Sequence, residues 1–335
     1  MNATDTMQEP MELVCPAGTP AALRTAVDAG ADAVYVGFRD ETNARNFPGL
    51  NFSRPELEAG ILYAHDRGAK VLVAINTYPR AGDQGPWHRA VADAAALDAD
   101  AVILADIGLC AHTAERHPQL RRHLSVQASA SNPASIRFYQ EAFGVQRVVL
   151  PRVLTVDQIR ALNREIDVET EVFVFGGLCT MAEGRCALSG YVTGISPNKD
   201  GACSPASQVR YEDRGDKLVA RLGCVCVDQF PTGAPAGYPT LCKGRYVAGD
   251  QAAYLFEEPT SLSMIEHLPA LQKAGVRALK IEGRQRGRAY VGRVVAAFRE
   301  AVDAVAAGLA PNARDLMTLA EGGRGTEGAY RKAWQ

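Results

Sequence analysis

The sequence predicts an α/β protein built as a TIM-type (β/α)8 barrel, with a long cysteine-bearing insertion between the seventh and eighth strands. Eight short runs are rich in strand-forming residues, and helical patterns separate the first seven of them. Runs composed almost entirely of Val, Ile and Leu are typical of a parallel sheet that helices cover. The chain has 335 residues, enough for a barrel of about 250 residues and an insertion. The eight runs begin at Glu12, Ala33, Val71, Ala101, His123, Arg147, Glu171 and Ala278.

The first two expected helices carry clear start and stop signals. Thr19 is a typical N-cap, Pro20 suits the first helical position, and Gly30 ends the pattern. The next helix repeats the arrangement, with Ser53 as its cap and Gly68 after its last turn. Successive starts of the first seven strands lie 21 to 38 residues apart. Each interval therefore has room for a strand, a helix and two loops.

The interval before the eighth strand breaks this rhythm. It spans 107 residues, from Glu171 to Ala278, where about 25 would serve. Two of its stretches are dense in Pro, Gly and Ser, which predicts turns, and "DKLVARLGCVCVDQF" between them reads as one or two strands. We expect four parts: a flexible N-terminal extension over 1–10, barrel strands one to seven over 11–175, the insertion over 176–277, and strand eight with a C-terminal helix over 278–335.

A doubly wound open sheet is the alternative fold. Two observations weigh against it: the count of eight strand-and-helix units, and the lack of a G-x-G-x-x-G turn after the first strand. The barrel remains the favoured fold.

Composition excludes several functional classes. The 36 Lys and Arg residues nearly balance 38 Asp and Glu, and no dense basic run occurs, so bulk charge argues against a nucleic-acid partner while a local basic groove stays open. No run of about 18 apolar residues predicts a membrane span. The first ten residues have no basic side chain and no apolar core, unlike a secretory signal. We therefore expect a cytoplasmic protein with eight reduced cysteines.

Four of those cysteines fall in loop-like sequence within the insertion, namely Cys179, Cys186, Cys203 and Cys242. A free cysteine usually behaves as a small buried hydrophobic residue, so four in irregular backbone suggest metal ligands. Their spacings of 7, 17 and 39 lack the C-x2-4-C pairs common in zinc sites. Four thiolates suit either zinc or a [4Fe-4S] cluster, and inert cysteines remain an alternative. We interpret Cys15, Cys110, Cys224 and Cys226 as packing residues, although the last two, a C-x-C pair, could substitute as ligands.

Reactive groups of such a barrel lie at the carboxyl ends of its strands, where the insertion also begins. Any metal held by the insertion would therefore lie over the barrel mouth. An arginine there could bind substrate or fasten a loop, and an amide could bind substrate or satisfy backbone groups. Lys280 and Glu282 point to the same side and could form an ion pair, or one could act as an acid or base. The polar residues at these strand ends are Asn43, Arg45, Asn76, Asp106, Gln127, Arg152, Glu282, Arg284 and Arg286.

Several motifs resemble the collagenase-like peptidase family from about Met11 to the C-terminal "KAWQ". They are "FGGLCTMAEGRC", "SPNKDGACSP", "GYPTLCKGRY" and "LKIEGRQRGRAYV", with "CPAG", "GADAVYVG" and "TNARNF" nearer the start. The resemblance implies that Cys179, Cys186, Cys203 and Cys242 ligate a [4Fe-4S] cluster. Peptidase activity itself is not expected, because the sequence has no H-E-x-x-H, no G-x-S-x-G, and no cysteine next to a plausible histidine base.

Within that family, the chain is most similar to the branch that hydroxylates the ubiquinone precursor ring without oxygen. Members of that branch work as a heterodimer with a sister protein that carries its own cluster, together with a lipid-carrier protein. The hydroxyl donor associated with this chemistry is prephenate, a dicarboxylate. Because a guanidinium can donate two parallel hydrogen bonds to one carboxylate, the residues expected to bind prephenate are Arg152, Arg45 and Arg284. Hydroxylation of RNA, as in other branches, and a noncatalytic electron-transfer or scaffold role are the alternatives.

Overall fold

The structure is a computed structural model that describes residues 10–197, 202–234, 236–312, 316–320 and 323–331. The N-terminal extension expected over 1–10 lies outside the described residues, apart from Pro10. In the described part of the chain, no helix is both long and apolar enough to cross a membrane.

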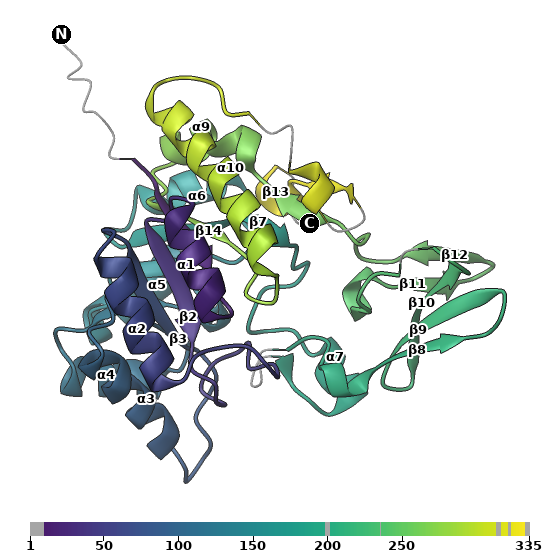
Figure 1. Cartoon of the computed structure of the whole chain (residues 1–335), viewed down its shortest axis with the longest axis horizontal. Coiled ribbons are helices and arrows are strands. Elements are labelled where there is room, and N and C mark those ends of the chain that lie inside the picture. Colours follow the sequence, from purple (N-terminus) through teal and green to yellow (C-terminus); the bar gives the residue numbers. More distant parts are fainter. Residues whose placement is uncertain (1–9, 198–201, 235, 313–315, 321–322, 332–335) are drawn as a thin grey trace.

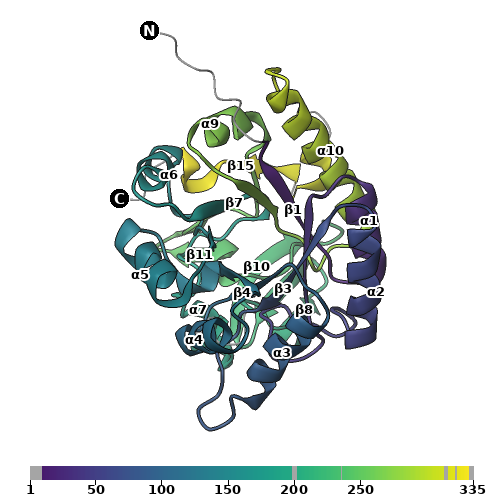
Figure 2. The ribbon, with the colours of Figure 1, turned by 90° about the vertical axis from the view of Figure 1, so that its left-hand side faces the viewer.

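Eight parallel strands form a closed barrel, which confirms the predicted fold (Figure 2). Each of the first seven pairs with the next along the chain, and the last strand pairs in parallel with both the first and the seventh. This double pairing closes the cylinder. The barrel strands are β1 (Glu12–Pro16), β2 (Ala33–Gly37), β3 (Lys70–Ile75), β4 (Ala101–Leu104), β5 (Arg121–Leu124), β6 (Arg147–Val149), β7 (Glu169–Gly177) and β14 (Ala278–Ile281).

Helices surround the barrel, and the predicted caps are present. The Thr19 side chain accepts a hydrogen bond from the Ala22 amide at 3.2 Å, and Ser53 forms a reciprocal capping box with Glu56. The apolar faces of these helices and the outward-facing strand residues form the main core. The helices are α1 (Pro20–Asp28), α2 (Arg54–His65), α3 (Gly85–Ala96), α4 (Ile107–Arg116), α5 (Pro133–Phe143), α6 (Val156–Asn163), α9 (Leu268–Lys273) and α10 (Arg288–Ala306).

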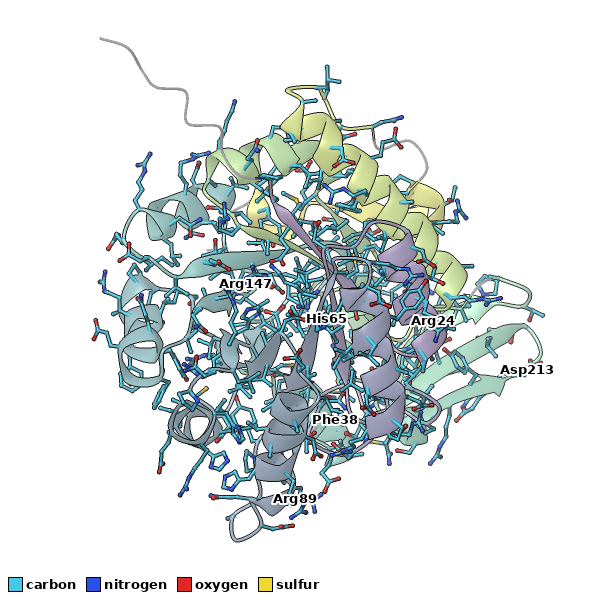
Figure 3. All side chains as sticks on the ribbon, turned by 60° about the vertical axis from the view of Figure 1, so that its left-hand side comes forward. Arg24, Phe38, His65, Arg89, Arg147 and Asp213 are labelled. Atoms are coloured by element: carbon cyan, nitrogen blue, oxygen red, sulfur yellow. The ribbon has the colours of Figure 1, made fainter. Side chains whose placement is uncertain are left out.

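The insertion projects from the barrel, and Asp213 marks its outer part (Figures 1 and 3). It contains an antiparallel sheet of three strands and a separate hairpin, held partly by a small core of Leu222, Val227 and Leu241. "DKLVARLGCVCVDQF" contributes to two of these strands, where the sequence predicted one or two. The elements are α7 (Leu188–Thr193), β8 (Val209–Asp213), β9 (Lys217–Leu222), β10 (Val225–Pro231), β11 (Arg245–Ala248) and β12 (Gln251–Tyr254).

The chain returns to the barrel before the end of the expected insertion range. Strand β13 (Ser261–Ser263) pairs antiparallel with the end of β7, and α9 then packs beside α6. A late strand, β15 (Gly325–Thr326), pairs with β13, and the buried Tyr330 hydroxyl donates to the Phe173 carbonyl at 2.8 Å. These pairings fasten the last described segment to β7. Short 3₁₀ helices complete the fold: η1 (Val126–Ala128), η2 (Ala206–Gln208), η3 (Leu241–Lys243), η4 (Ile265–His267), η5 (Met317–Leu319) and η7 (Gly328–Tyr330).

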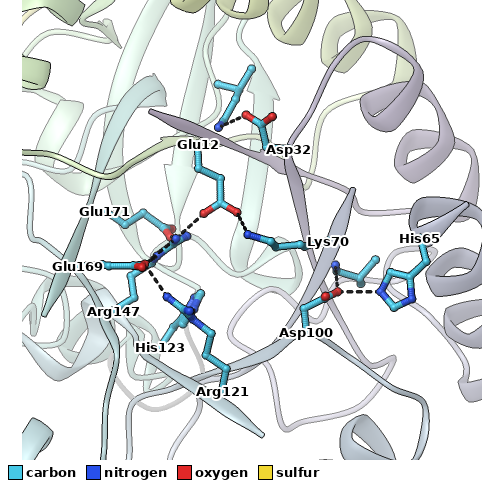
Figure 4. Close-up of polar contacts among 12 residues, drawn as sticks. Glu12, Asp32, His65, Lys70, Asp100, Arg121, His123, Arg147, Glu169 and Glu171 are labelled. Carbon is cyan, nitrogen blue, oxygen red and sulfur yellow. Dashed lines mark hydrogen bonds and ion pairs between the residues drawn. The ribbon is translucent and has the colours of Figure 1, made fainter. Parts of the chain in front are cut away.

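Charged side chains occupy the amino-terminal half of the barrel interior (Figure 4). Arg147 forms ion pairs with Glu12, Glu169 and Glu171. Lys280 pairs with Glu171 at 2.5 Å. Because each buried charge has an opposite charge beside it, the network avoids the cost of an isolated buried ion.

Buried His123 lies within this network and makes the stability of the fold depend on pH. Burial lowers the pKa of His123 well below its ordinary value, and Arg147 and Arg121 lower it further. The Arg121 Nε donates to His123 Nε2 at 3.0 Å, so the ring nitrogen that accepts this bond is unprotonated. Below pH 6.5 the unfolded chain binds a proton that the folded protein does not. The free energy of unfolding should therefore fall as pH falls, by about 1 kcal/mol between pH 6.5 and 5.5.

Urea unfolding at pH 7.5, 6.5 and 5.5 measures this loss. Glu12, in the same network, should not contribute to this loss. Burial raises the pKa of Glu12, but Arg147 lowers it below its ordinary value, so that carboxylate stays ionised across this pH range. His123→Asn should remove most of the pH dependence, while His65→Asn, on the outer surface of α2, should retain it. Equal slopes in the wild type and His123→Asn would show that another group is responsible.

Candidate active site at the carboxyl face of the barrel

A buried guanidinium that forms no ion pair with any described residue lies at the barrel mouth. Arg284 follows β14, is 5% exposed, and donates from Nη1 to Asn43 Oδ1 at 3.3 Å. Its Cζ lies 5.6 Å from the centre of the Tyr35 ring. Among the residues that the structure describes, no Asp or Glu carboxylate forms an ion pair with it. A buried cation without a counter-ion is costly, so this position favours an anionic ligand.

The surroundings of Arg284 reinforce that preference. Burial is the main cause that lowers the pKa of Arg284 to about 10. Tyr35 and Glu282 act in the opposite direction and raise this pKa, whereas the positive charge of Arg45 lowers it further. Two guanidinium groups thus share the mouth, and an anion placed between them would relieve their repulsion.

Two glycines allow this arginine to approach the strand ends. A Cβ built on Gly37 would lie 2.6 Å from Asn43 Cγ and 2.8 Å from Arg284 Nη1. A Cβ on Gly18 would lie 1.9 Å from the Arg284 carbonyl oxygen. A larger residue at Gly18 would displace the backbone of the loop that follows β14, and one at Gly37 would displace the Asn43 and Arg284 side chains.

Lys280 and Glu282 do not form the ion pair that the sequence suggested. Lys280 pairs with Glu171 and lies 3.9 Å from the centre of the Tyr35 ring, whereas Glu282 Oε2 accepts from the Gly177 amide at 3.1 Å. Strand β14 ends at Ile281, after an irregularity in its register with β7. Glu282 has therefore left the strand and faces the mouth, while Lys280 stays in the charged interior.

Arg152, the first expected substrate ligand, binds the protein through two of its guanidinium nitrogens. Its Nε donates to Glu183 Oε1 at 2.6 Å, and its Nη1 donates to the Gly177 carbonyl. Its Cζ lies 4.0 Å from the centre of the Phe173 ring. Burial alone would lower the pKa of Arg152, but Glu183 raises it above the ordinary value. The loop-fastening alternative for this arginine is therefore the arrangement observed.

The two amide candidates connect neighbouring loops at the mouth. Asn76 Oδ1 accepts from the Ala44 amide at 3.0 Å, and its Nδ2 donates to Ser125 Oγ at 3.3 Å. Gln127 lies in η1, where its carbonyl accepts from the Tyr78 hydroxyl at 2.9 Å. Asn76 thus holds the loop after β2, which carries Arg45, against the ends of β3 and β5.

The other polar residues at the strand ends divide between the mouth and purely local roles. The Arg45 backbone amide donates to Asn43 Oδ1 at 3.0 Å, so the Asn43 side chain contacts both the backbone of Arg45 and the guanidinium of Arg284. Asp106 caps α4 by accepting from the Leu109 amide at 2.8 Å. Arg286 is exposed beside Tyr290.

The four cysteines of the insertion are electrostatic neighbours. Burial is the main cause that raises the pKa of Cys179 to about 12, and Cys242 contributes to the increase. Burial also raises the pKa of Cys242, with further contributions from Cys203 and Cys186. Cys242, in η3, therefore lies within electrostatic range of the other three. Cys15 and Cys110 are buried in the main core, as expected of packing residues.

The thiol side chains of this quartet are suitable metal ligands, but in this structure they are not arranged around one metal position. In the described ranges, no three His, Cys, Asp or Glu side chains are already positioned to hold a metal ion. Cys242 and the three thiols near it nevertheless supply the soft sulfur set that zinc or a [4Fe-4S] cluster requires. The Cys179–Cys186 loop meets the barrel where Ser129 Oγ donates to the Glu183 carbonyl. The quartet thus lies at the same end of the barrel as Arg284.

Sequence reasoning missed three residues of this site. Glu183 pairs with Arg152, Tyr35 lies against Arg284, and Gly37 makes room for it. Glu183 lies inside a motif noted for its cysteines, but nothing in the local pattern shows which base it pairs with. Tyr35 could have been found, because its alternation with buried Val34 and Val36 directs it into the barrel.

The fold and site together define a (β/α)8-barrel protein with a cysteine-bearing insertion at its carboxyl face. The model of the family described as "Peptidase family U32" matches residues 18–324. The chain therefore belongs to peptidase family U32, which agrees with the resemblance noted from the sequence.

Relatives within this family carry names of different kinds. The chain is 35% identical to "tRNA hydroxylation protein P" of Escherichia coli, over 96% of this chain and 74% of that protein. It is 34% identical to "Uncharacterized protease MJ0090" of Methanocaldococcus jannaschii (88% and 66%). It is 30% identical to "23S rRNA 5-hydroxycytidine C2501 synthase" of E. coli, over 88% of this chain but only 40% of that protein. The solved structure of the U32 peptidase Mk0906 matches with a TM-score of 0.50 at 14% identity, covering 83% of this chain and 94% of that one, and shows the fold alone.

Proposed function

We propose that this chain is the iron–sulfur subunit of an oxygen-independent hydroxylase that acts on the ring of a ubiquinone precursor, as in the UbiU branch of the family. The observation that carries the proposal is that Cys242 lies within electrostatic range of three other thiols at the same end of the barrel as Arg284, a buried guanidinium that forms no ion pair among the described residues. The names of several relatives support hydroxylation as the reaction class. The name "Uncharacterized protease MJ0090" of one relative would favour proteolysis, but the sequence has no H-E-x-x-H and no G-x-S-x-G motif to supply a metal-bound water or an activated serine.

Cys179, Cys186, Cys203 and Cys242 would hold the [4Fe-4S] cluster. When bound, such a cluster supplies one-electron redox chemistry that protein side chains lack. The chain's own contribution is to hold the loops that carry these thiols close to the mouth.

The mouth would bind the hydroxyl donor through its arginines. Prephenate carries two carboxylates, and Arg284 presents a guanidinium with unfilled donor positions in a buried setting. Arg45 adds a second positive charge, and Glu282 faces the same space, where it can accept or release a proton. Asn76 and Gln127 would then shape the mouth by holding its loops, rather than bind the donor directly.

The precursor ring would be presented by partners. In this proposal a UbiV-like sister protein forms a heterodimer with the chain, and a lipid-carrier protein delivers the precursor in the cytoplasm. The branch resemblance supports these partners. A noncatalytic electron-transfer or scaffold role would place the reacting ring entirely on the sister protein.

RNA hydroxylation is the second candidate, and the comparisons give a specific reason to keep it. The 35% identity with a tRNA hydroxylation protein covers nearly the whole chain. Against it, the net charge is -2 and the sequence has no dense basic run with which to bind phosphate backbones.

Complementation under anaerobic conditions separates the two candidates. A bacterial strain that lacks the chain's counterpart in ubiquinone synthesis and its RNA-hydroxylating relatives would express either the wild type or Cys242→Ala. Mass spectrometry would then measure ubiquinone and hydroxylated nucleosides in the same cells. We expect the wild type to restore ubiquinone only, and Cys242→Ala to restore neither. Restored hydroxynucleosides without ubiquinone would instead assign the chain to RNA.

A further inference from the structure

We propose that Arg152 and Glu183 form a latch that holds the Cys179–Cys186 loop against the barrel mouth. Arg152 is then a positioning residue for the cysteine quartet, not a ligand for the substrate. The effect of the latch on iron binding rests on the proposed function, whereas its effect on the loop does not.

The barrel side of the latch is a guanidinium with its donors directed at the loop. Arg152 follows β6, and its side chain is only 6% exposed. One nitrogen donates to the Glu183 carboxylate and another to the Gly177 carbonyl, at the point where the cysteine loop leaves β7. The guanidinium plane also lies over Phe173 of β7. Arg152 therefore grips both the beginning and the middle of the loop.

The loop side of the latch is Glu183, which lies between the two cysteines in sequence and has a 10% exposed side chain. Its carboxylate accepts from the Arg152 side chain, and its carbonyl accepts from Ser129 Oγ. The next residue, Gly184, packs so closely that a Cβ there would lie 2.0 Å from the Gln127 carbonyl oxygen. Contacts from the loops after β5 and β6 thus converge on one short stretch of the cysteine loop.

Because both charged groups are buried, the loop is expected to be either fastened by the Arg152–Glu183 pair or detached. Removing one partner leaves the other as an unpaired buried charge, which is far less favourable than removing both charges together. The loop that bears Glu183 can move into water more easily than the barrel can, so it should detach when Arg152 is neutralised. Cys179 and Cys186 would then move away from Cys242, with which both interact electrostatically in the fastened loop.

Trypsin cleavage after Arg185 reports directly on the state of the loop. Arg185 is exposed but lies within the fastened stretch, two residues after Glu183. A protease needs several residues of extended chain, so cleavage there requires the loop to detach. On the full-length protein prepared without iron, Arg152→Met and Glu183→Gln should each raise the cleavage rate at this bond at least tenfold, as measured by mass spectrometry. Arg152→Lys, which keeps the charge, should give a smaller increase.

Arg299→Met is the matched control, because Arg299 pairs with Asp32 at 3.0 Å at the opposite end of the barrel. It should leave cleavage after Arg185 unchanged. Iron bound after anaerobic reconstitution should fall at least twofold in Arg152→Met but not in the control. Unchanged cleavage in both latch variants would overturn the proposal, as would loss of prephenate binding by Arg152→Met with the loop still protected. A wild type that binds no iron would refute the proposed function and leave the cleavage test valid.

Discussion

A chain with alanine at Cys242 is expected to lose most of its iron and sulfide, and with them all hydroxylation. Cys242 is the thiol that lies within electrostatic range of Cys179, Cys186 and Cys203. In the proposed cluster, this substitution removes the ligand that lies near the other three, and a cluster with only three thiolates is open to solvent and oxidation. We expect less than about a fifth of the wild-type iron after anaerobic purification, as counted by colorimetric iron and sulfide assays.

Cys226→Ala is the matched control for this substitution. Cys226 lies on β10 of the same insertion, where its thiol contacts the Asp228 carbonyl. Its removal should leave the iron content near that of the wild type. Normal iron in Cys242→Ala, or equal losses in both variants, would contradict the assignment of ligands.

Replacing Arg284 with methionine is expected to lower hydroxylation about 100-fold while leaving the iron content intact. Methionine fills much of the same space, and no acidic partner among the described residues is left unpaired. The substitution therefore removes mainly the buried positive charge offered to the donor. Hydrogen bonds to a charged group contribute up to about 3 kcal/mol, which corresponds to roughly two powers of ten in rate.

The test of Arg284 needs both a rate and a binding measurement. Single-turnover hydroxylation and calorimetric binding of prephenate should both weaken in Arg284→Met. Arg286→Met, two residues further on and exposed beside Tyr290, should behave like the wild type. Wild-type hydroxylation by Arg284→Met would remove this residue from the donor site.

The barrel could be predicted from the sequence because each strand-and-helix unit is marked by signals within a few neighbouring residues. Strand runs such as Ala33–Gly37 are continuous in buried residues, and caps such as Thr19 and Ser53 depend on neighbours only three residues away. Pairings between distant segments have no such local signal. The antiparallel pairing of β13 with β7 and the return of α9 to the barrel were therefore not anticipated.

The residues of the site could be predicted by type, but not their partners. Arg152 and Arg284 look alike in the sequence, since both follow barrel strands near other polar residues. Only the fold shows that Arg152 meets Glu183, 31 residues away, while Arg284 meets Asn43 and an aromatic ring. Likewise, Lys280 finds its counter-ion on β7, 109 residues away in sequence. Charge pairing of this kind depends on strand order and register, which periodicity does not determine.

Anaerobic Mössbauer spectroscopy of the iron-57-labelled wild type, combined with metal and sulfide counts, would determine whether the chain holds a [4Fe-4S] cluster. We expect about four irons and four sulfides per chain, with isomer shifts of tetrahedral sulfur-ligated iron. A colourless protein without iron, or one zinc per chain with no sulfide, would contradict it.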